Sequence, residues 1–161
     1  MVEATALPPL FLFHGDWSRY VEEVYDIYSV TIFKGNLLLE NKPVRCRHHP
    51  PSKGKGYGFW HVVQEGKVED DRIPDLRRCE RIRWISWMIQ QVGKNPEITW
   101  WEESRGTEED RLLWLEAEDY LIILSKRNDY WLLKTAYMTN RHHKRTTLRK
   151  NRDAYWVAKK C

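Results

Sequence analysis

Residues 118–138 read EDYLIILSKRNDYWLLKTAYM, and this stretch decides the fold class. Two runs rich in β-branched and aromatic residues flank Asn128 and Asp129, a pair that is typical of the turn in a β-hairpin. Residues 139–156, TNRHHKRTTLRKNRDAYW, follow directly and have the length and composition of a basic helix. The sequence therefore predicts an antiparallel hairpin that leads into a cationic helix, and this arrangement favours an anionic ligand such as a phosphodiester.

The segments before this unit predict further strands and helices. ITWWEES (98–104) and RLLWLEAE (111–118) have the composition of strands, and Gly106 lies in the turn that joins them. Residues 75–92 have helical periodicity, and Pro74 stands where a helix often begins. Apolar FWHVV (59–63) begins another regular element.

The first fifty-odd residues predict a helix, a hairpin and a loop. Asp16 is placed to cap a helix whose apolar residues run from Trp17 to Tyr28 at spacings of three and four. SVTIF (29–33) and NLLLENKPV (36–44) bracket a turn at Lys34 and Gly35, and Pro43 is expected to end this hairpin. RCRHHPPSKGKGYG (45–58) is expected to be a surface loop, because its prolines, glycines and basic residues cannot bury a core face.

These segments together predict an α+β protein. N-terminal helices and a small hairpin pack on a C-terminal twisted antiparallel sheet of three to four strands, and a basic helix ends the chain. A length of 161 residues fits one domain, 1–161, with an N-terminal extension at 1–54 and a core at 55–161.

Composition and charge narrow the classes of partner. The net charge is +4, but after Ser125 the basic residues face only Asp129 and Asp153 in opposition. Such a tail is either the solvated face of a helix or a surface that binds a polyanion. No apolar run approaches the roughly 18–20 residues that span a bilayer, and residues 6–13, ALPPLFLF, lack the basic leader of a secretory peptide. We expect a cytoplasmic protein without a membrane partner.

Metal and cofactor sites are not indicated by the sequence. The three cysteines, Cys46, Cys79 and Cys161, are widely spaced and form no CxxC pair, so reduced thiols are expected. The two His-His pairs are adjacent in sequence, and neighbouring side chains on a helix or strand point in different directions. We therefore expect no metal and no cofactor.

The residue types fit metal-free cleavage of RNA, which needs a base for the 2′-hydroxyl, an acid for the 5′-oxygen and cations around the phosphate. Thr135 and Tyr137 are two apart on an expected strand, so their side chains share a face and Lys134 takes the other. Tyr137 could equally pack in the core, with Trp131 and Leu133 on the same face. His61 lies among apolar residues, where burial favours a neutral base, although a structural core histidine fits the same position.

The segment RRCERIRWISW (77–87) supplies candidate phosphate clamps. Glu80 can orient one guanidinium and leave another free for a phosphate, and Arg81 and Arg83 are the expected clamps. Salt bridges on a helix surface explain the same residues. Metal-free ribonuclease activity therefore stands beside two alternatives: an RNA- or DNA-binding module without catalysis, and a phage accessory protein that binds a protein partner through its aromatic surface.

The order of these motifs resembles a known superfamily. GFWHVV (58–63), RCERIRW (78–84), WWEE (100–103), residues 112–138 and the final basic HHKR helix (142–145) resemble the phage- and prophage-borne ribonuclease-like proteins of the barnase, EndoU, colicin and RelE superfamily. The resemblance covers roughly residues 55–155.

The resemblance implies a metal-independent, toxin-like endoribonuclease that leaves a 2′,3′-cyclic phosphate. RNA, with transfer RNA as one candidate, and a cognate inhibitor protein would be its partners. The implied catalytic residues are His61, Arg81, Thr135, Tyr137 and His143. Lys134 and Lys144 are weaker candidates from the resemblance, and with Arg83 and Arg145 they are the residues that we expect to bind substrate.

Overall fold

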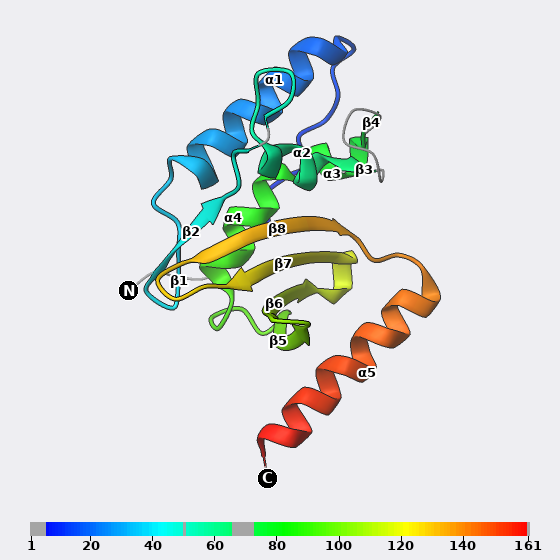
Figure 1. Cartoon of the computed structure of the whole chain (residues 1–161). Coiled ribbons are helices and arrows are strands. Elements are labelled where there is room, and N and C mark those ends of the chain that lie inside the picture. The colour runs from blue at the N-terminus through cyan, green and yellow to red at the C-terminus, as the bar shows by residue number, and fades with distance from the viewer. Residues whose placement is uncertain (1–5, 50, 66–72, 161) are drawn as a thin grey trace.

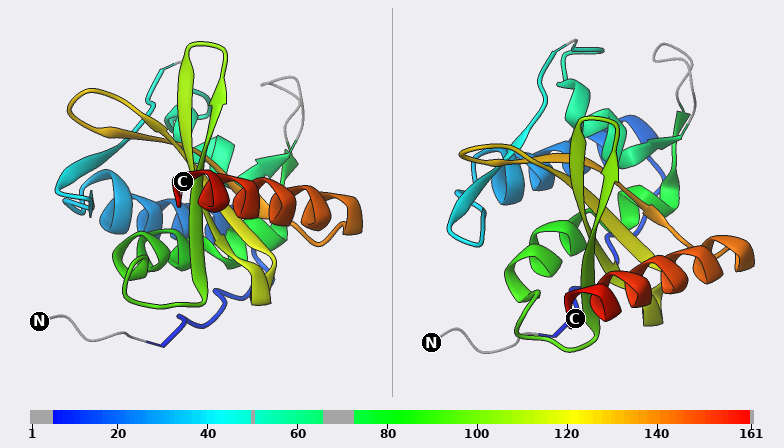
Figure 2. Two further views of the ribbon diagram at one scale, coloured as in Figure 1. Left: turned by 90° about the horizontal axis from the view of Figure 1, so that it is seen from below. Right: turned by 60° about the horizontal axis from the view of Figure 1, so that its bottom comes forward.

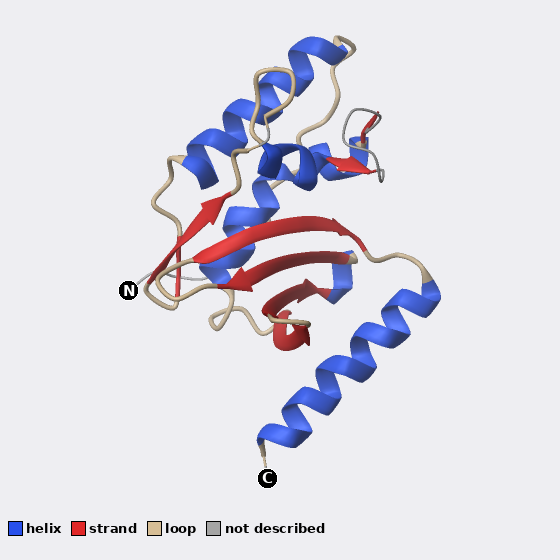
Figure 3. Ribbon diagram, viewed as in Figure 1, coloured by secondary structure: helices blue, strands red, loops and turns tan. Residues whose placement is uncertain are grey.

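The computed structural model describes residues 6–49, 51–65 and 73–160. The described residues form an α+β fold (Figures 1 and 3). The α-helices are α1 (Trp17–Tyr28), α2 (Tyr57–Val63), α3 (Leu76–Glu80), α4 (Ile82–Gln91) and α5 (His142–Lys159). The strands are β1 (Leu38–Leu39), β2 (Lys42–Cys46), β3 (Gln64–Glu65), β4 (Ile73–Pro74), β5 (Ile98–Arg105), β6 (Glu108–Leu115), β7 (Tyr120–Lys126) and β8 (Trp131–Met138). No helix among the described residues is both long enough and apolar enough to cross a membrane.

The main sheet is larger than the sequence predicts. Its six strands run in the order β1-β2-β8-β7-β6-β5, and β5 to β8 form the expected antiparallel meander. The expected limit of three to four antiparallel strands is wrong, because β2 adds to β8 in parallel through Val44, Arg45 and Cys46. Pro43 lies just outside that ladder and pairs with Leu38 of β1, so its missing N–H does not interrupt the β2–β8 pairing.

The expected hairpin around Lys34 and Gly35 is wrong in its position. Ser29–Phe33 continues α1 as a π-helical turn, and the Thr31 hydroxyl donates a 2.7 Å hydrogen bond to the Ile27 carbonyl. The chain instead reverses at Glu40 and Asn41, which both have positive φ and join β1 to β2. Tertiary packing, with Ile32 buried, outweighs the strand preference of this β-branched run.

The expected N-terminal helix is confirmed. Asp16 caps α1 by accepting a 3.1 Å hydrogen bond from the Arg19 amide, and Tyr20, Val24 and Tyr28 are buried on one face. The expected helix at 75–92 divides in two at Arg81, whose φ of −101° and ψ of 16° separate α3 from α4.

Helices cover both faces of the sheet (Figures 1 and 2). The larger core lies between the sheet and α1, α2, α3 and α4, where it includes Phe59, Ile85 and Ile122. The smaller core lies under α5, where Leu148 packs with a cluster that includes Trp101 and Trp114. The protein therefore has two apolar layers, one on each face of a single sheet.

A β-bulge in β8 sets which residues face each core. Leu133 pairs with Leu124 and Thr135 pairs with Ile123, which leaves Lys134 as the extra residue. Leu133 therefore lies in the larger core with Trp131, whereas Tyr137 packs against the smaller one. The expectation that Trp131 and Leu133 share the face of Tyr137 is wrong, because a bulge reverses the alternation of side chains along a strand.

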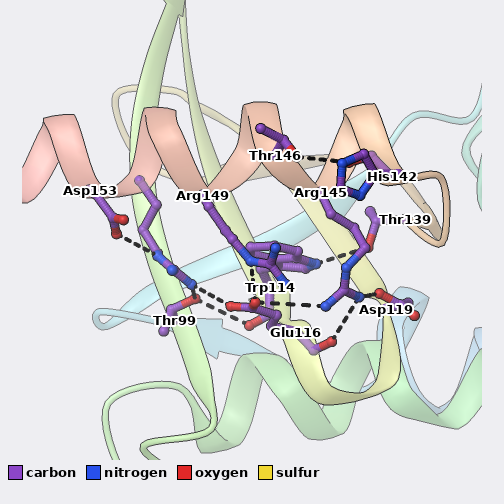
Figure 4. Close-up of polar contacts among 11 residues, drawn as sticks. Thr99, Trp114, Glu116, Asp119, Thr139, His142, Arg145, Thr146, Arg149 and Asp153 are labelled. Carbon is purple, nitrogen blue, oxygen red and sulfur yellow. Dashed lines mark hydrogen bonds and ion pairs between the residues drawn. The ribbon is translucent and has the colours of Figure 1, made fainter.

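Polar contacts hold α5 on the sheet (Figure 4). Glu116, just after β6, accepts hydrogen bonds from Arg149 at 2.6 Å and Arg152 at 2.9 Å. Burial by itself raises the pKa of Glu116, but these hydrogen bonds and charges outweigh burial and leave the pKa lowered. The Trp114 indole donates a 2.9 Å hydrogen bond to the Thr139 hydroxyl within the buried layer. These contacts fix the middle of α5 against the end of β6, and they tie Thr139, between β8 and α5, to β6.

Candidate functional site

A cavity of about 490 Å³ lies where α3, the end of β8 and the start of α5 meet. Cationic or titratable side chains dominate its lining, together with Tyr137 and one carboxylate. These cationic, titratable and acidic residues are Arg77, Arg78, Arg141, Lys144, His143 and Asp75. We call this the junction cavity. Its positive charge suits a phosphate group more than a neutral ligand.

The start of α5 adds to this positive potential. The first turn of the helix contains no acidic residue, and the N-cap Arg141 makes no side-chain hydrogen bond to the helix amides. The N-terminus of a helix carries a partial positive charge, so cations placed there are unfavourable until an anion approaches. His143 and Lys144 lie in that turn and also line the cavity. The N-terminus of α5 and the cationic side chains of the junction cavity therefore both favour an anionic ligand.

Tyr137 lies between two of these cations. The Arg78 guanidinium carbon lies 5.7 Å from the centre of the Tyr137 ring, and the Lys144 Nζ lies 5.5 Å from it. Asp75, 3.7 Å from Arg78 Nε, helps to orient that guanidinium. An aromatic ring that carries a hydroxyl and has two cations against it is an arrangement that can meet a phosphodiester and stabilise negative charge on it.

The structure brings three of the predicted site residues, Tyr137, His143 and Lys144, into the junction cavity. Arg77 and Arg78 line it as well, although neither was among the predicted site residues. Both arginines lie in the predicted helical segment at 77–80. Helical periodicity did not reveal that the helix breaks at Arg81, between α3 and α4.

His61 and Lys134 line a second cavity, of about 180 Å³, beside α2 and β8. We call this the side cavity. Arg47 and Arg127 contribute to it, together with Glu108 from the start of β6. The hydrogen bond and charge of Lys134, together with Arg127, lower the pKa of the Glu108 carboxyl. The side cavity is therefore also lined mainly by cations, and Glu108 is the carboxylate among its lining residues.

Thr135 connects the residues of the two cavities. Its hydroxyl donates a 2.9 Å hydrogen bond to the backbone carbonyl of His61. The same carbonyl accepts a 3.4 Å hydrogen bond from Arg78 Nη1, which reaches it from the junction cavity. His61, Thr135, Arg78 and Tyr137 therefore form one continuous set of contacts along β8.

The remaining predicted residues lie elsewhere. Arg81 donates to the Arg77 carbonyl at 3.0 Å and lies over Trp84. Arg83 lies over the Phe11 ring and lines a shallow cavity next to α1. Arg145 forms ion pairs with Asp119 and Glu116 (Figure 4). The geometric expectation that His61, Arg81, Thr135, Tyr137 and His143 surround one pocket is therefore not met.

The two described thiols, Cys46 and Cys79, do not line the junction cavity. Cys46 and Cys79 are buried and free, and burial raises their pKa to about 11 and about 12. Cys161 lies outside the described residues. Within ranges 6–49, 51–65 and 73–160, no three His, Cys, Asp or Glu side chains are grouped closely enough to hold a metal ion.

Comparison with protein-family models, with curated proteins and with solved structures finds no significant match for this chain.

Proposed function

We propose that the protein is a metal-independent endoribonuclease and that the junction cavity holds the scissile phosphodiester. The observation that carries this proposal is the position of Tyr137 between Arg78 and Lys144, in a cavity that His143 also lines. These side chains supply proton-transfer groups and cations, which are what cleavage through the 2′-hydroxyl of RNA requires.

The proposed reaction is a transesterification. The 2′-oxygen forms a bond to phosphorus while the bond between phosphorus and the 5′-oxygen breaks. His143 takes the proton of the 2′-hydroxyl, and Tyr137 gives a proton to the departing 5′-oxygen. Both groups then return to their starting states by exchanging protons with water, and the product ends in a 2′,3′-cyclic phosphate.

The cations have separate roles in this proposal. Arg78 and Lys144 neutralise the charge that builds up on the phosphorane, because both lie against the Tyr137 ring. Arg77 and Arg141 are exposed at the cavity and bind neighbouring phosphates of the strand. Arg81, Arg83 and Arg145 have no part in binding, since each is held elsewhere.

Product analysis tests the proposal. Purified protein should cleave total RNA and transfer RNA in the presence of EDTA, and the products should carry 2′,3′-cyclic phosphate ends. Binding that weakens with salt but gives no cleavage would favour a nucleic-acid-binding module in the same cavity. A toxin role with a cognate inhibitor is tested separately, by growth arrest on expression and its relief by a co-expressed neighbouring gene.

A further inference from the structure

The side cavity contains a carboxylate held in a position that suits a phosphate. Glu108 Oε2 lies 3.0 Å from Lys134 Nζ, and Glu108 Oε1 lies 3.3 Å from Arg127 Nη2. The carboxylate thus bridges two cations through its two oxygens. Two oxygens of a phosphate can make the same bridge, because carboxylates and phosphates both present paired charged acceptors to cations.

The cations of the side cavity are fixed by other groups, so they do not depend on Glu108. Asp110, whose side chain is fully buried, lies 3.2 Å from Lys134 Nζ. Arg127 donates a 2.7 Å hydrogen bond to the Ser125 hydroxyl. The Arg47 guanidinium stacks 4.3 Å from the centre of the Tyr57 ring. These supports would keep the cations in place if Glu108 left.

The Glu108 side chain is placed so that it can rotate out of the side cavity. The side chain is 39% exposed, and Glu108 begins β6 directly after the turn of the β5–β6 hairpin, which projects from the rest of the sheet (Figure 2). An exposed ion pair of this kind contributes little to stability. A rotation of this one side chain would therefore open the site without disturbing the fold.

We propose that Arg47, Arg127 and Lys134 form a second phosphate subsite, which Glu108 occupies in the free protein and which a flanking phosphate of the RNA strand takes over. This proposal rests on the endoribonuclease proposal for its substrate. Lys134 of this subsite and Tyr137 of the junction cavity lie on the same strand, β8.

A direct test is titration of the ¹⁵N-labelled full chain with inorganic phosphate, followed by NMR. Glu108→Gln should bind phosphate roughly two- to fivefold more tightly than the native chain, because the competing charge of a surface ion pair is lost. The amide and side-chain signals of Arg47, Arg127 and Lys134 should shift. Lys134→Met combined with Arg127→Met should remove these shifts.

Glu109→Gln is the matched control, since Glu109 is the exposed neighbour of Glu108 on the same hairpin. An equal gain in both variants would show a general effect of net charge and overturn the proposal. Phosphate shifts confined to the junction cavity would overturn it as well.

The subsite and the ribonuclease can fail independently. If Glu108→Gln tightens phosphate binding but no RNA is cleaved, the subsite stands and the catalytic proposal falls. If RNA is cleaved but Glu108→Gln changes neither phosphate affinity nor KM for a short oligonucleotide, the subsite falls alone.

Discussion

The hydroxyl of Thr135 donates a hydrogen bond to the backbone carbonyl oxygen of His61 over 2.9 Å, and this contact ties the middle of β8 to the end of α2. The two residues are far apart in sequence, and both were candidates for catalysis on residue type alone. In the structure the Thr135 hydroxyl holds two elements together, which gives it a role in positioning.

Thr135→Val should therefore lower stability. The variant keeps the shape of the side chain but removes the 2.9 Å hydrogen bond to the His61 carbonyl. The free energy of unfolding should fall by about 0.5–1.5 kcal/mol, as measured by urea denaturation. Thr135→Ser, which keeps the hydroxyl, should lose less. A Thr135→Val protein as stable as the native chain would show that this hydrogen bond contributes nothing.

The Glu116 network predicts a loss of stability in acid. The pKa of Glu116 is lowered in the folded protein, so its contribution is fully present above its ordinary pKa of 4.5 and is lost as pH falls through the folded value. Glu116→Gln should cost about 1–2 kcal/mol at pH 7. The difference should shrink towards zero in denaturation curves recorded at progressively lower pH. A difference that stays constant with pH would contradict the ion-pair explanation.

We expect replacement of the buried Arg111, which packs between rings of the larger core, to lower stability strongly. Its guanidinium carbon lies 3.9 Å from the centre of the Trp100 ring and 4.9 Å from that of Trp131, and Nη2 lies 2.9 Å from Glu102. Arg111→Met should lower the free energy of unfolding by about 2–4 kcal/mol.

Lys126→Met is the matched control for this change, because Lys126 is an exposed cation 3.7 Å from the same Glu102 carboxylate. It should cost less than about 0.5 kcal/mol. Equal losses of stability in the two variants would show that the effect does not come from the position of Arg111 between the Trp100 and Trp131 rings.

The proposed role of Tyr137 separates its hydroxyl from its ring. Tyr137→Phe keeps the ring that Arg78 and Lys144 flank and removes only the proton donor, so kcat for RNA cleavage should fall about 10²-fold or more with little change in KM. Tyr155→Phe, on a tyrosine of α5 that packs against the smaller core and does not line the cavity, should change neither kcat nor KM. An unchanged kcat in Tyr137→Phe would show that the Tyr137 hydroxyl is not the proton donor.

Local patterns predicted much of the fold. The turn at Asn128 and Asp129, the Gly106 turn and the Asp16 cap each depend on residues close in sequence, and the structure contains all three elements. Residues 36–44 were predicted as part of a hairpin, but the parallel pairing of β2 with β8 was missed, because it joins residues far apart in sequence and has no local sign. The bulge at Lys134 is a similar case, since the alternation of side chains in WLLKTAYM does not reveal an extra residue.

The candidate site was predicted only in part, for the same reason. Tyr137, His143 and Lys144 adjoin each other through a short connection, so sequence could place them together. Arg78 reaches the cavity from α3, and Arg81 turns away where α3 ends, which depends on the backbone at a single residue.

The most direct test that catalysis takes place in the junction cavity compares variants of two adjacent histidines. His143 lines the cavity and His142 does not, although both are exposed in the first turn of α5. Initial rates of RNA cleavage in EDTA should fall by about 10²- to 10⁴-fold in His143→Ala and stay within about twofold of native in His142→Ala. Equal activity of the two variants, at the native rate or at a reduced one, would contradict the account.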